Sequence, residues 1–136
     1  MNQLFLKILD ESVTCTLATA SCDGMPEVAT IGYAADEKYR LYFQTFPHYR
    51  KYKNLKTNPR ASIVITQKFH SVQMDGEVEE LKGGNCERAR HMLIDKYGHV
   101  MEAYLNSPDA VFFKFSPTWI RLLKDDMYPP TYEMIE

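Results

Sequence analysis

Hydrophobic and polar positions alternate along this chain, and the period of the alternation changes several times. Apolar residues recur at helical spacing in residues 3–11, which predicts a short amphipathic helix. In residues 12–21 apolar and polar residues alternate with a period of two, which predicts a half-buried strand. Asp23-Gly24 is a turn signal typical of a hairpin, so residues 27–34 are predicted to form the returning strand.

The remaining elements follow from the same patterns. Further strands are predicted over residues 40–45, 60–66, 71–82, 110–115 and 118–123, the last two joined at Ser116-Pro117. Helices are predicted from about Pro47 to Asn58 and from Cys86 to Tyr97, and residues 125–136 are predicted to be irregular. Two glycines interrupt strand patterns. Gly76 indicates a bend or bulge, and Gly32 indicates a bulge or a close approach by another group.

The order of elements defines the fold class. A helix, three strands, a helix, two strands, a helix and two strands follow one another, with hairpin turns between consecutive strands. This order favours an antiparallel sheet, and the number of strands suits a small β-barrel with peripheral helices. With 136 residues, of which 45% are hydrophobic and 25% charged, the chain is expected to be one globular domain over residues 1–136.

Several site classes receive no support from the sequence. The three cysteines are odd in number and form no CxxC pair, so neither a disulfide framework nor a zinc site is predicted. The four histidines show no HxxxH or HExxH spacing, so no metal site is expected. The N-terminal apolar run is too short for a signal peptide or a membrane span. A reduced, cytoplasmic protein is the expectation.

Positive charge is concentrated in one part of the chain. The segment from Lys38 to Met74 contains no Asp or Glu but holds eight of the sixteen Lys and Arg residues, although the formal net charge of the whole chain is -2. Such asymmetry indicates an anionic partner at one face. A pI near 6.1 argues against duplex DNA and anionic membranes, which recruit broader basic surfaces, so a small anion is the preferred partner.

The densest part of this segment is "FPHYRKYKNLKTNP", residues 46–59. A helix that starts just after a strand exposes unpaired backbone N–H groups and the positive end of its dipole. Arg50 and Lys51 are expected in or next to that first turn, and Thr45 adds a hydroxyl at the end of the preceding strand. This combination is suited to a phosphate. A solvated cationic helix face is an equally compatible interpretation of the spacing.

Other candidate groups have ordinary structural explanations. Stacking on single-stranded nucleic acid is the alternative for the aromatics around the cationic segment, but a core role is favoured because Tyr42 and Phe43 lie in an alternating strand whose other face must be core. These aromatics are Tyr39, Tyr42, Phe46, Tyr49 and Tyr52. The acids Asp75, Glu77 and Glu79 are interpreted as a solvated strand face. No catalytic side chain is identified.

A resemblance adds to this picture. The stretches "TLATASCDGMPEVATIGYA", "LYFQT", "YRKYKNLKTNPRASIVI" and "VQMDGEVEEL" occur in the order and spacing of the pyridoxamine 5′-phosphate oxidase-like family of FMN-binding split barrels. The chain resembles this family in register from about Val13 to Leu81 and more loosely beyond. The resemblance implies an antiparallel split β-barrel of Greek-key type, with FMN held at the interface of a homodimer.

The resemblance also implies roles for individual residues. An Arg-Lys pair at the positions of Arg50 and Lys51 binds the FMN phosphate in the family, and Lys53 is expected to assist. The strand that matches Thr30, Ile31, Gly32 and Tyr33 lies along the flavin ring, and Thr45 matches a residue near the flavin. Two positions depart from the oxidase pattern, since Ala29 and Ala34 stand where an Arg and a Lys also hold phosphate.

The implied function is FMN-dependent oxidoreduction of a small molecule, in a flavin reductase, oxidase or nitroreductase-like reaction with NAD(P)H or another electron donor. Pyridoxine phosphate oxidation itself is not expected, because the C-terminus "TYEMIE" lacks the basic, His-containing substrate motif of the true oxidases. A protein that holds flavin or another anionic cofactor without turnover is the alternative, and haem is a conceivable ligand. Neither nucleic acid nor a membrane is an expected partner.

Overall fold

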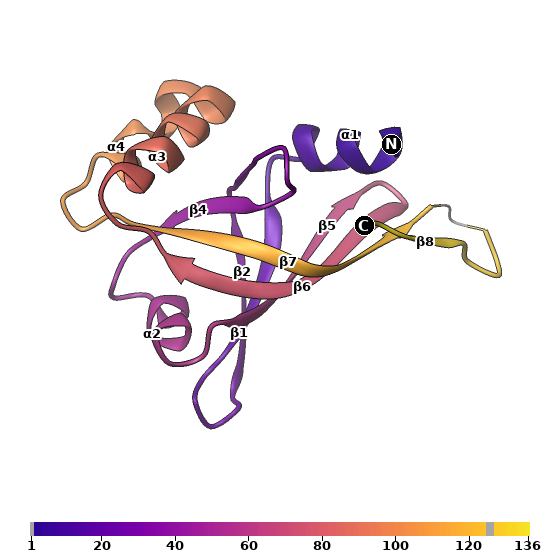
Figure 1. The fold of residues 1–136 in the computed structure, drawn as a ribbon, viewed down its shortest axis with the longest axis horizontal. Helices are drawn as coiled ribbons and strands as arrows, with labels where there is room; N and C mark the ends of the chain where they lie inside the picture. The colour runs from indigo at the N-terminus through magenta and orange to yellow at the C-terminus, as the bar shows by residue number, and fades with distance from the viewer. Residues whose placement is uncertain (1, 125–126) are drawn as a thin grey trace.

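The computed structural model describes residues 2–124 and 127–136, which form one curled antiparallel sheet flanked by helices (Figure 1). The strands are β1(Cys15–Ala20), β2(Pro26–Ile31), β3(Ala34–Ala35), β4(Leu41–Thr45), β5(Arg60–Gln67), β6(His70–Glu80), β7(Val111–Leu123) and β8(Tyr132–Met134). Their order in the sheet is β2-β1-β5-β6-β7-β4-β3, and β8 pairs with β7. The sheet confirms the predicted mainly-β, antiparallel class and takes the form of a half-barrel.

The helices lie around this sheet. They are α1(Gln3–Glu11), α2(Arg50–Thr57), α3(Gly84–Tyr97), a 3₁₀ turn η1(Gly98–Met101) and α4(Glu102–Leu105). In the view of Figure 1, α3 and α4 lie above β4 and β7, whereas α2 lies below them. No helix of the described residues has both the length and the apolar composition needed to cross a membrane.

Helix α1 forms where the sequence pattern predicts it. Asn2 caps its start, since the Asn2 side chain accepts a hydrogen bond of 2.9 Å from the Phe5 N–H. Phe5, Ile8 and Leu9 lie on one face and are buried. They pack into the larger of two hydrophobic clusters, where Phe43 and Phe113 stack with ring centres 5.5 Å apart. The smaller cluster lies beneath α3 and includes Ala89, Leu93 and Phe112.

The C-terminal part of the sheet corrects two predictions. Residues 110–123 were predicted as two strands joined at Ser116-Pro117, but β7 is continuous through Pro117. Its partner β6 changes register between Asp75 and Gly76, so Asp75 faces Trp119 while Gly76 faces Pro117. The bulge therefore accommodates the proline without ending the strand. The predicted irregular tail contains β8, and Asp125 and Asp126 lie outside the described residues.

Gly76 confirms the bulge that its position in the sequence predicts. A Cβ atom at this residue would lie 2.3 Å from the Ser116 carbonyl oxygen. Because that neighbour is backbone, no side chain is compatible with this close approach.

The predicted strand over residues 27–34 is interrupted at Gly32. Strand β2 ends at Ile31 and pairs with β1, whereas β3 begins at Ala34 and pairs with β4. Between them, the N–H and C=O of Tyr33 form hydrogen bonds of 2.9 and 3.0 Å with the phenol oxygen of Tyr97. The phenol takes the place of a neighbouring strand at this point, and the chain passes from one end of the sheet to the other.

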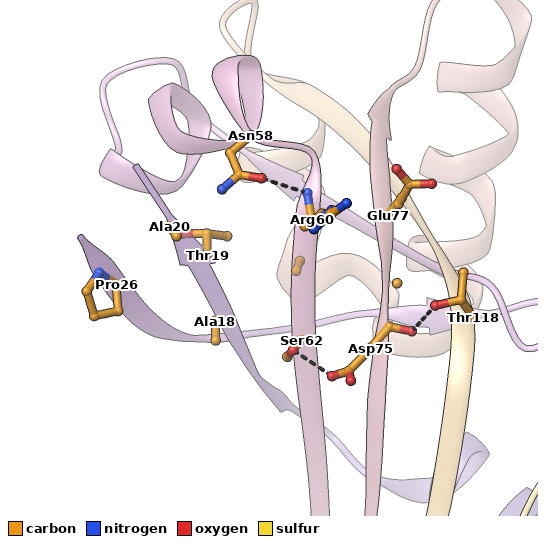
Figure 2. A pocket seen from close by; sticks show the side chains of 12 residues that line it. Ala18, Thr19, Ala20, Pro26, Asn58, Arg60, Ser62, Asp75, Glu77 and Thr118 are labelled. Carbon is orange, nitrogen blue, oxygen red and sulfur yellow. Dashed lines mark hydrogen bonds between the residues drawn. The ribbon is translucent and has the colours of Figure 1, made fainter. Parts of the chain in front are cut away.

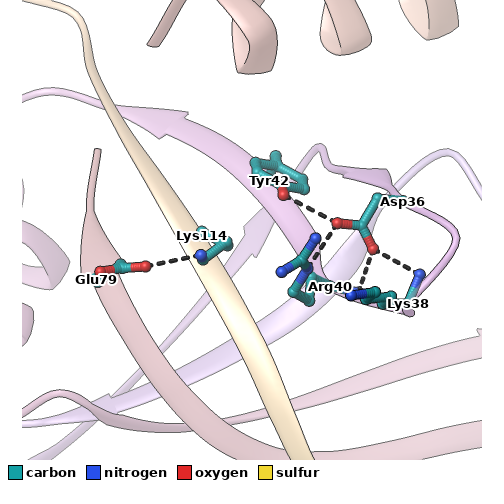
Figure 3. A network of polar contacts seen from close by, with 6 residues as sticks. All are labelled: Asp36, Lys38, Arg40, Tyr42, Glu79 and Lys114. Carbon is teal, nitrogen blue, oxygen red and sulfur yellow. Dashed lines mark hydrogen bonds and ion pairs between the residues drawn. The ribbon is translucent and has the colours of Figure 1, made fainter. Parts of the chain in front are cut away.

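The turn that leads into β4 is organised by Asp36. Its side chain is 1% exposed and accepts hydrogen bonds from the backbone N–H groups of Lys38 and Arg40, the Arg40 guanidinium and the Tyr42 hydroxyl (Figure 3). Burial alone would raise the pKa of Asp36, but these hydrogen bonds hold the pKa below its ordinary value. A second ion pair in the same view joins Lys114 of β7 to Glu79 of β6 at 2.8 Å.

Candidate functional site

Arg50 and Lys51 are the first two residues of α2, which places them in its first turn, where the sequence predicts them. The helix begins three residues later than predicted from Pro47, because residues 46–49 form a turn in which the Tyr49 N–H bonds to the Phe46 carbonyl. The side chain of Tyr49, the N-cap residue, makes no capping hydrogen bond to the described chain, and the first turn contains no acid. The helix dipole and two cations therefore coincide at an end that no side chain caps.

The two cations differ sharply in exposure. Lys51 is 9% exposed, and its ammonium lies 4.6 Å from the centre of the Tyr49 ring. Burial lowers the pKa of Lys51, and nearby Glu27 acts in the opposite direction. The Arg50 side chain is 77% exposed. Sequence periodicity assigned Tyr49, Tyr52 and Leu55 to one face, but the buried residues of α2 are Lys51 and Leu55.

Glu27 of β2 is the residue that sequence reasoning missed. Its carboxylate lies 3.5 Å from the Arg50 Nε atom, so an acid from outside the acid-free segment meets the cations. It also accepts a 3.2 Å hydrogen bond from the Thr19 hydroxyl, which in turn accepts one of 3.1 Å from the Asn54 side chain. The period-2 alternation of β2 could have indicated that Glu27 points inward, since Glu27 shares the more buried face of the strand with Ala29 and Ile31.

Thr45 lies at the end of β4, five residues before Arg50. The residue is 2% exposed, and its hydroxyl oxygen has no hydrogen-bond partner in residues 2–124 and 127–136. A buried hydroxyl without a partner costs about 1–3 kcal/mol, so such groups mark places where a ligand or water supplies the missing bond. We call Arg50, Lys51, Thr45 and the uncapped start of α2 the cationic corner.

The other predicted flavin-contacting residues lie further along β2. Thr30 is exposed and faces Thr16 of β1, while Ile31 and Tyr33 are buried. The close approach predicted at Gly32 is present and is made by Tyr97, whose phenol oxygen would lie 3.1 Å from a Cβ at this position. The structure thus joins Arg50 and Lys51 with Glu27 at one end of β2. Residues 30–33 lie towards its other end. Lys53 is exposed on α2.

A cleft of about 670 Å³ opens across β1, β5, β6 and β7 and reaches Asn58, the residue that caps the C-terminal end of α2 (Figure 2). Its surface is formed largely by small residues, including Ala18, Ala61 and Gly76. Polar groups line it as well. The Ser62 hydroxyl donates a 2.7 Å hydrogen bond to Asp75, and the Thr118 hydroxyl donates to the Asp75 carbonyl. The cleft is also lined by Thr19 of β1, which bonds to Glu27, and by Pro26, which precedes Glu27 in β2.

The aromatic residues near the cationic segment serve mainly the core. Tyr42 is 4% exposed, Tyr52 packs against Phe113, and the Tyr39 ring meets the Phe5 ring edge-on. Phe46 and Tyr49 remain at the surface, where each ring contacts that of His48. This arrangement agrees with the core role favoured from the sequence.

The cysteine in β1, the acids of β6 and possible metal ligands are the other groups that could take part in chemistry. Cys15 is buried in β1, and burial raises the pKa of its thiol to about 12. Asp75, Glu77 and Glu79 form the exposed face of β6, as predicted. Over the described ranges, no three His, Cys, Asp or Glu side chains are grouped closely enough to hold a metal ion.

Comparison with known proteins identifies the family. The model of the pyridoxamine 5′-phosphate oxidase family matches residues 1–124. The chain belongs to this family. A search of curated proteins found no match.

Solved structures share the fold at low sequence identity. The heme storage protein HutZ from Vibrio cholerae has a TM-score of 0.76 and 16% identity, with 84% of this chain and 87% of that chain covered. A heme binding protein from Mycobacterium smegmatis has a TM-score of 0.78 and 20% identity over 95% of this chain, which spans 55% of that protein. An F420 reductase has a TM-score of 0.73 and 24% identity, with 88% and 98% covered. The TM-scores show a common fold, and at identities this low the likeness concerns the fold alone.

Proposed function

We propose that this family member is an FMN-dependent oxidoreductase that binds the phosphate of FMN at the cationic corner. The observation that carries the proposal is the buried Thr45 hydroxyl without a partner, at the strand end that leads into the Arg50-Lys51 turn. A phosphorylated cofactor would supply both the missing hydrogen bond and the negative charge that the uncapped helix start attracts.

The geometry of β2 also suits an elongated cofactor. Glu27, beside Arg50, and Gly32 are five residues apart in an extended chain, so they are separated by about 16 Å. A phosphate bound at Arg50 and Lys51 would therefore leave the ring system of the same molecule near residues 30–33, with Lys53 available to the phosphate from the exposed side of α2. When bound, a flavin supplies the hydride-transfer chemistry itself, and the protein binds and orients it.

A homodimer is part of the same proposal. The open cleft across four strands and the exposed apolar residues of the β1–β2 ribbon suit coverage by a second copy. Met25 is 67% exposed and Val28 is 63% exposed. Sedimentation of the purified protein tests this part directly, and a monomer at micromolar concentration would contradict it.

The alternative is a protein that holds its cofactor without turnover, and the cofactor could then be haem. Two of the compared structures are described as heme-binding or heme-storage proteins. The observation in this chain that favours haem is His48, whose exposed imidazole stacks on Phe46 next to the cationic corner. Haem propionates would also be attracted to Arg50 and Lys51.

The absorption spectrum of protein purified without added cofactor separates these functions. A flavin spectrum that bleaches on addition of NADH or NADPH is the expected result. A flavin spectrum that no nicotinamide bleaches favours the non-catalytic holder, and a Soret band favours haem. A colourless protein that also fails to bind added FMN would contradict the proposed function.

A further inference from the structure

Glu27 occupies an unusual position for an acid, because it lies against the cations proposed to bind a phosphate. One carboxylate oxygen is 3.5 Å from the Arg50 Nε atom, and the other accepts the hydrogen bond from the Thr19 hydroxyl. The Glu27 side chain is 9% exposed, whereas the Arg50 side chain is 77% exposed. The acid is thus the enclosed partner of this ion pair, and the arginine is the partner that is free to move.

The contacts of Glu27 hold it in place independently of Arg50. Thr19 is 3% exposed and is itself fixed by the 3.1 Å hydrogen bond from Asn54 of α2. The chain of contacts Asn54–Thr19–Glu27 therefore joins α2 to the β1–β2 ribbon. By contrast, the Arg50–Glu27 separation of 3.5 Å is long for a charge-assisted hydrogen bond. An incoming anion can draw Arg50 away while Glu27 remains.

This arrangement changes what the cationic corner can bind. An anion that approaches Arg50 and Lys51 is attracted by two cations and repelled by one fixed carboxylate. The three charges sum to about +1, and any anion that uses Arg50 must also replace Glu27 as its partner, so the net gain for a ligand with a single charge is small. A phosphate monoester carries about -1.5 to -2 charges at neutral pH and three acceptor oxygens, so its attraction is larger.

We infer that Glu27 is a specificity-determining residue that neutralises Arg50 in the free protein and restricts the cationic corner to phosphate monoesters. This inference rests on the proposed function for the identity of the full ligand, FMN, but the charge relationship itself concerns any anion. Glu27 lowers the affinity of the cationic corner for every anion, so that only a ligand with the charge and the acceptor oxygens of a phosphate monoester binds measurably.

The test compares Glu27→Gln with the wild type and with Glu80→Gln. Gln is isosteric with Glu, and its amide oxygen can keep the hydrogen bond from Thr19. Glu80 is a matched control, since its carboxylate also pairs with a cation of α2, Lys56, at 3.0 Å, and with Lys82 at 3.2 Å. Titrations use FMN, riboflavin, inorganic phosphate and acetate at pH 8, followed by flavin fluorescence and by the NMR shift of the Arg50 Nε–H group.

Glu27→Gln is expected to bind FMN and inorganic phosphate at least fivefold more tightly than the wild type and to gain measurable acetate binding. Riboflavin, which lacks the phosphate, should bind all three proteins equally, and Glu80→Gln should match the wild type. If Glu27→Gln folds poorly, Glu27→Ala with the same titrations replaces it, and the expected direction is the same.

The outcomes distinguish this inference from the proposed function. Equal or weaker binding of FMN and inorganic phosphate by the Glu27 variants overturns the inference and leaves FMN binding intact. Tighter inorganic phosphate binding by Glu27→Gln, with no FMN binding by any of the proteins, supports the inference and overturns the proposed function. Failure of all the proteins to bind any of these anions overturns both.

Discussion

The ammonium group of Lys96 lies 3.7 Å from the centre of the Tyr33 ring and has no hydrogen-bond partner within the described parts of the chain. Lys96 belongs to α3, so this contact fixes the helix against the residue that follows the Gly32 interruption. Burial lowers the pKa of Lys96 to about 8, while Cys15 and Asp10 act in the opposite direction. The aromatic ring compensates only part of the lost hydration. The charged form of Lys96 therefore destabilises the folded state.

Replacement of Lys96 by methionine is expected to stabilise the protein at pH 7, by on the order of 1–2 kcal/mol after allowance for partial solvation of the side chain. The folded pKa of about 8 lies below the ordinary value of 10.5, so the unfolded chain holds this proton more tightly. The penalty is complete below pH 8 and disappears as the pH rises towards 10.5. Urea unfolding of both proteins at pH 7, 9 and 10.5 measures this penalty as a difference in the free energy of unfolding.

The matched control for this experiment is Lys7→Met, at an exposed position of α1. The stability difference between Lys96→Met and the wild type should shrink with rising pH, and Lys7→Met measures the effect of replacing an exposed lysine by methionine. A Lys96→Met protein that is less stable than the wild type at pH 7 would show that the cation–π contact outweighs desolvation.

Removal of the charges at the start of α2 should weaken FMN binding. The double variant Arg50→Ala with Lys51→Met removes both cations and keeps most of the buried stem of Lys51. Loss of one charge-assisted contact to phosphate costs about 1.5–3 kcal/mol, so FMN affinity should fall by at least tenfold. Flavin fluorescence titration measures it, with Lys38→Ala, on the turn before β4, as the control. Equal FMN affinities of the two variants would contradict the placement of the phosphate.

Thr45→Val tests the unpartnered hydroxyl. Valine has nearly the same shape, and it removes a polar group that lacks a partner, so the free energy of unfolding should be unchanged or increased. FMN affinity should fall about fivefold, because one hydrogen bond of about 1 kcal/mol is lost.

Thr19→Val is the comparison for Thr45→Val, because the Thr19 hydroxyl bonds to both Glu27 and Asn54. It should lower the free energy of unfolding by about 1–2 kcal/mol. Destabilisation of the Thr45 variant by a similar amount, with FMN binding unchanged, would show that the Thr45 hydroxyl serves the fold.

Local patterns predicted most of the elements because their signals lie within a few residues. The helix over residues 3–11 follows from apolar spacing, and the hairpin from Asp23-Gly24. The continuity of β7 could not be predicted in this way. It depends on a register shift at Gly76 of β6, about forty residues earlier in the sequence, and a local pattern around Pro117 carries no information on its partner strand.

The candidate site was predictable to a similar extent. The position of Arg50 and Lys51 at a helix start follows from the strand, the turn residues and the stop at Asn58-Pro59. The burial of Lys51 and the presence of Glu27 depend on how β2 packs against α2, and a count of charges along the segment treats every cation as solvated. Contacts between distant segments decide which charges meet.

The contact between Tyr97 and Gly32 allows a double-mutant test of the strand interruption. Tyr97→Phe leaves the Tyr33 N–H without its partner and should cost about 1–3 kcal/mol. Gly32→Ala places a methyl group 3.1 Å from the Tyr97 phenol oxygen, a tight contact that should cost about 1 kcal/mol. The double variant lacks that oxygen, so the added methyl should cost less there, with a coupling of at least about 0.5 kcal/mol.

Chemical denaturation of the four proteins at one pH measures this coupling. Gly84→Ala is the control for an added methyl group, because a Cβ at that position meets nothing within 4 Å among the described residues. Its effect should be the same in the wild type and in Tyr97→Phe. Strict additivity of Gly32→Ala and Tyr97→Phe would mean that the phenol oxygen does not restrict Gly32, and would leave the Tyr97 ring carbons, 3.3 and 3.5 Å from a Cβ at Gly32, as the neighbouring atoms.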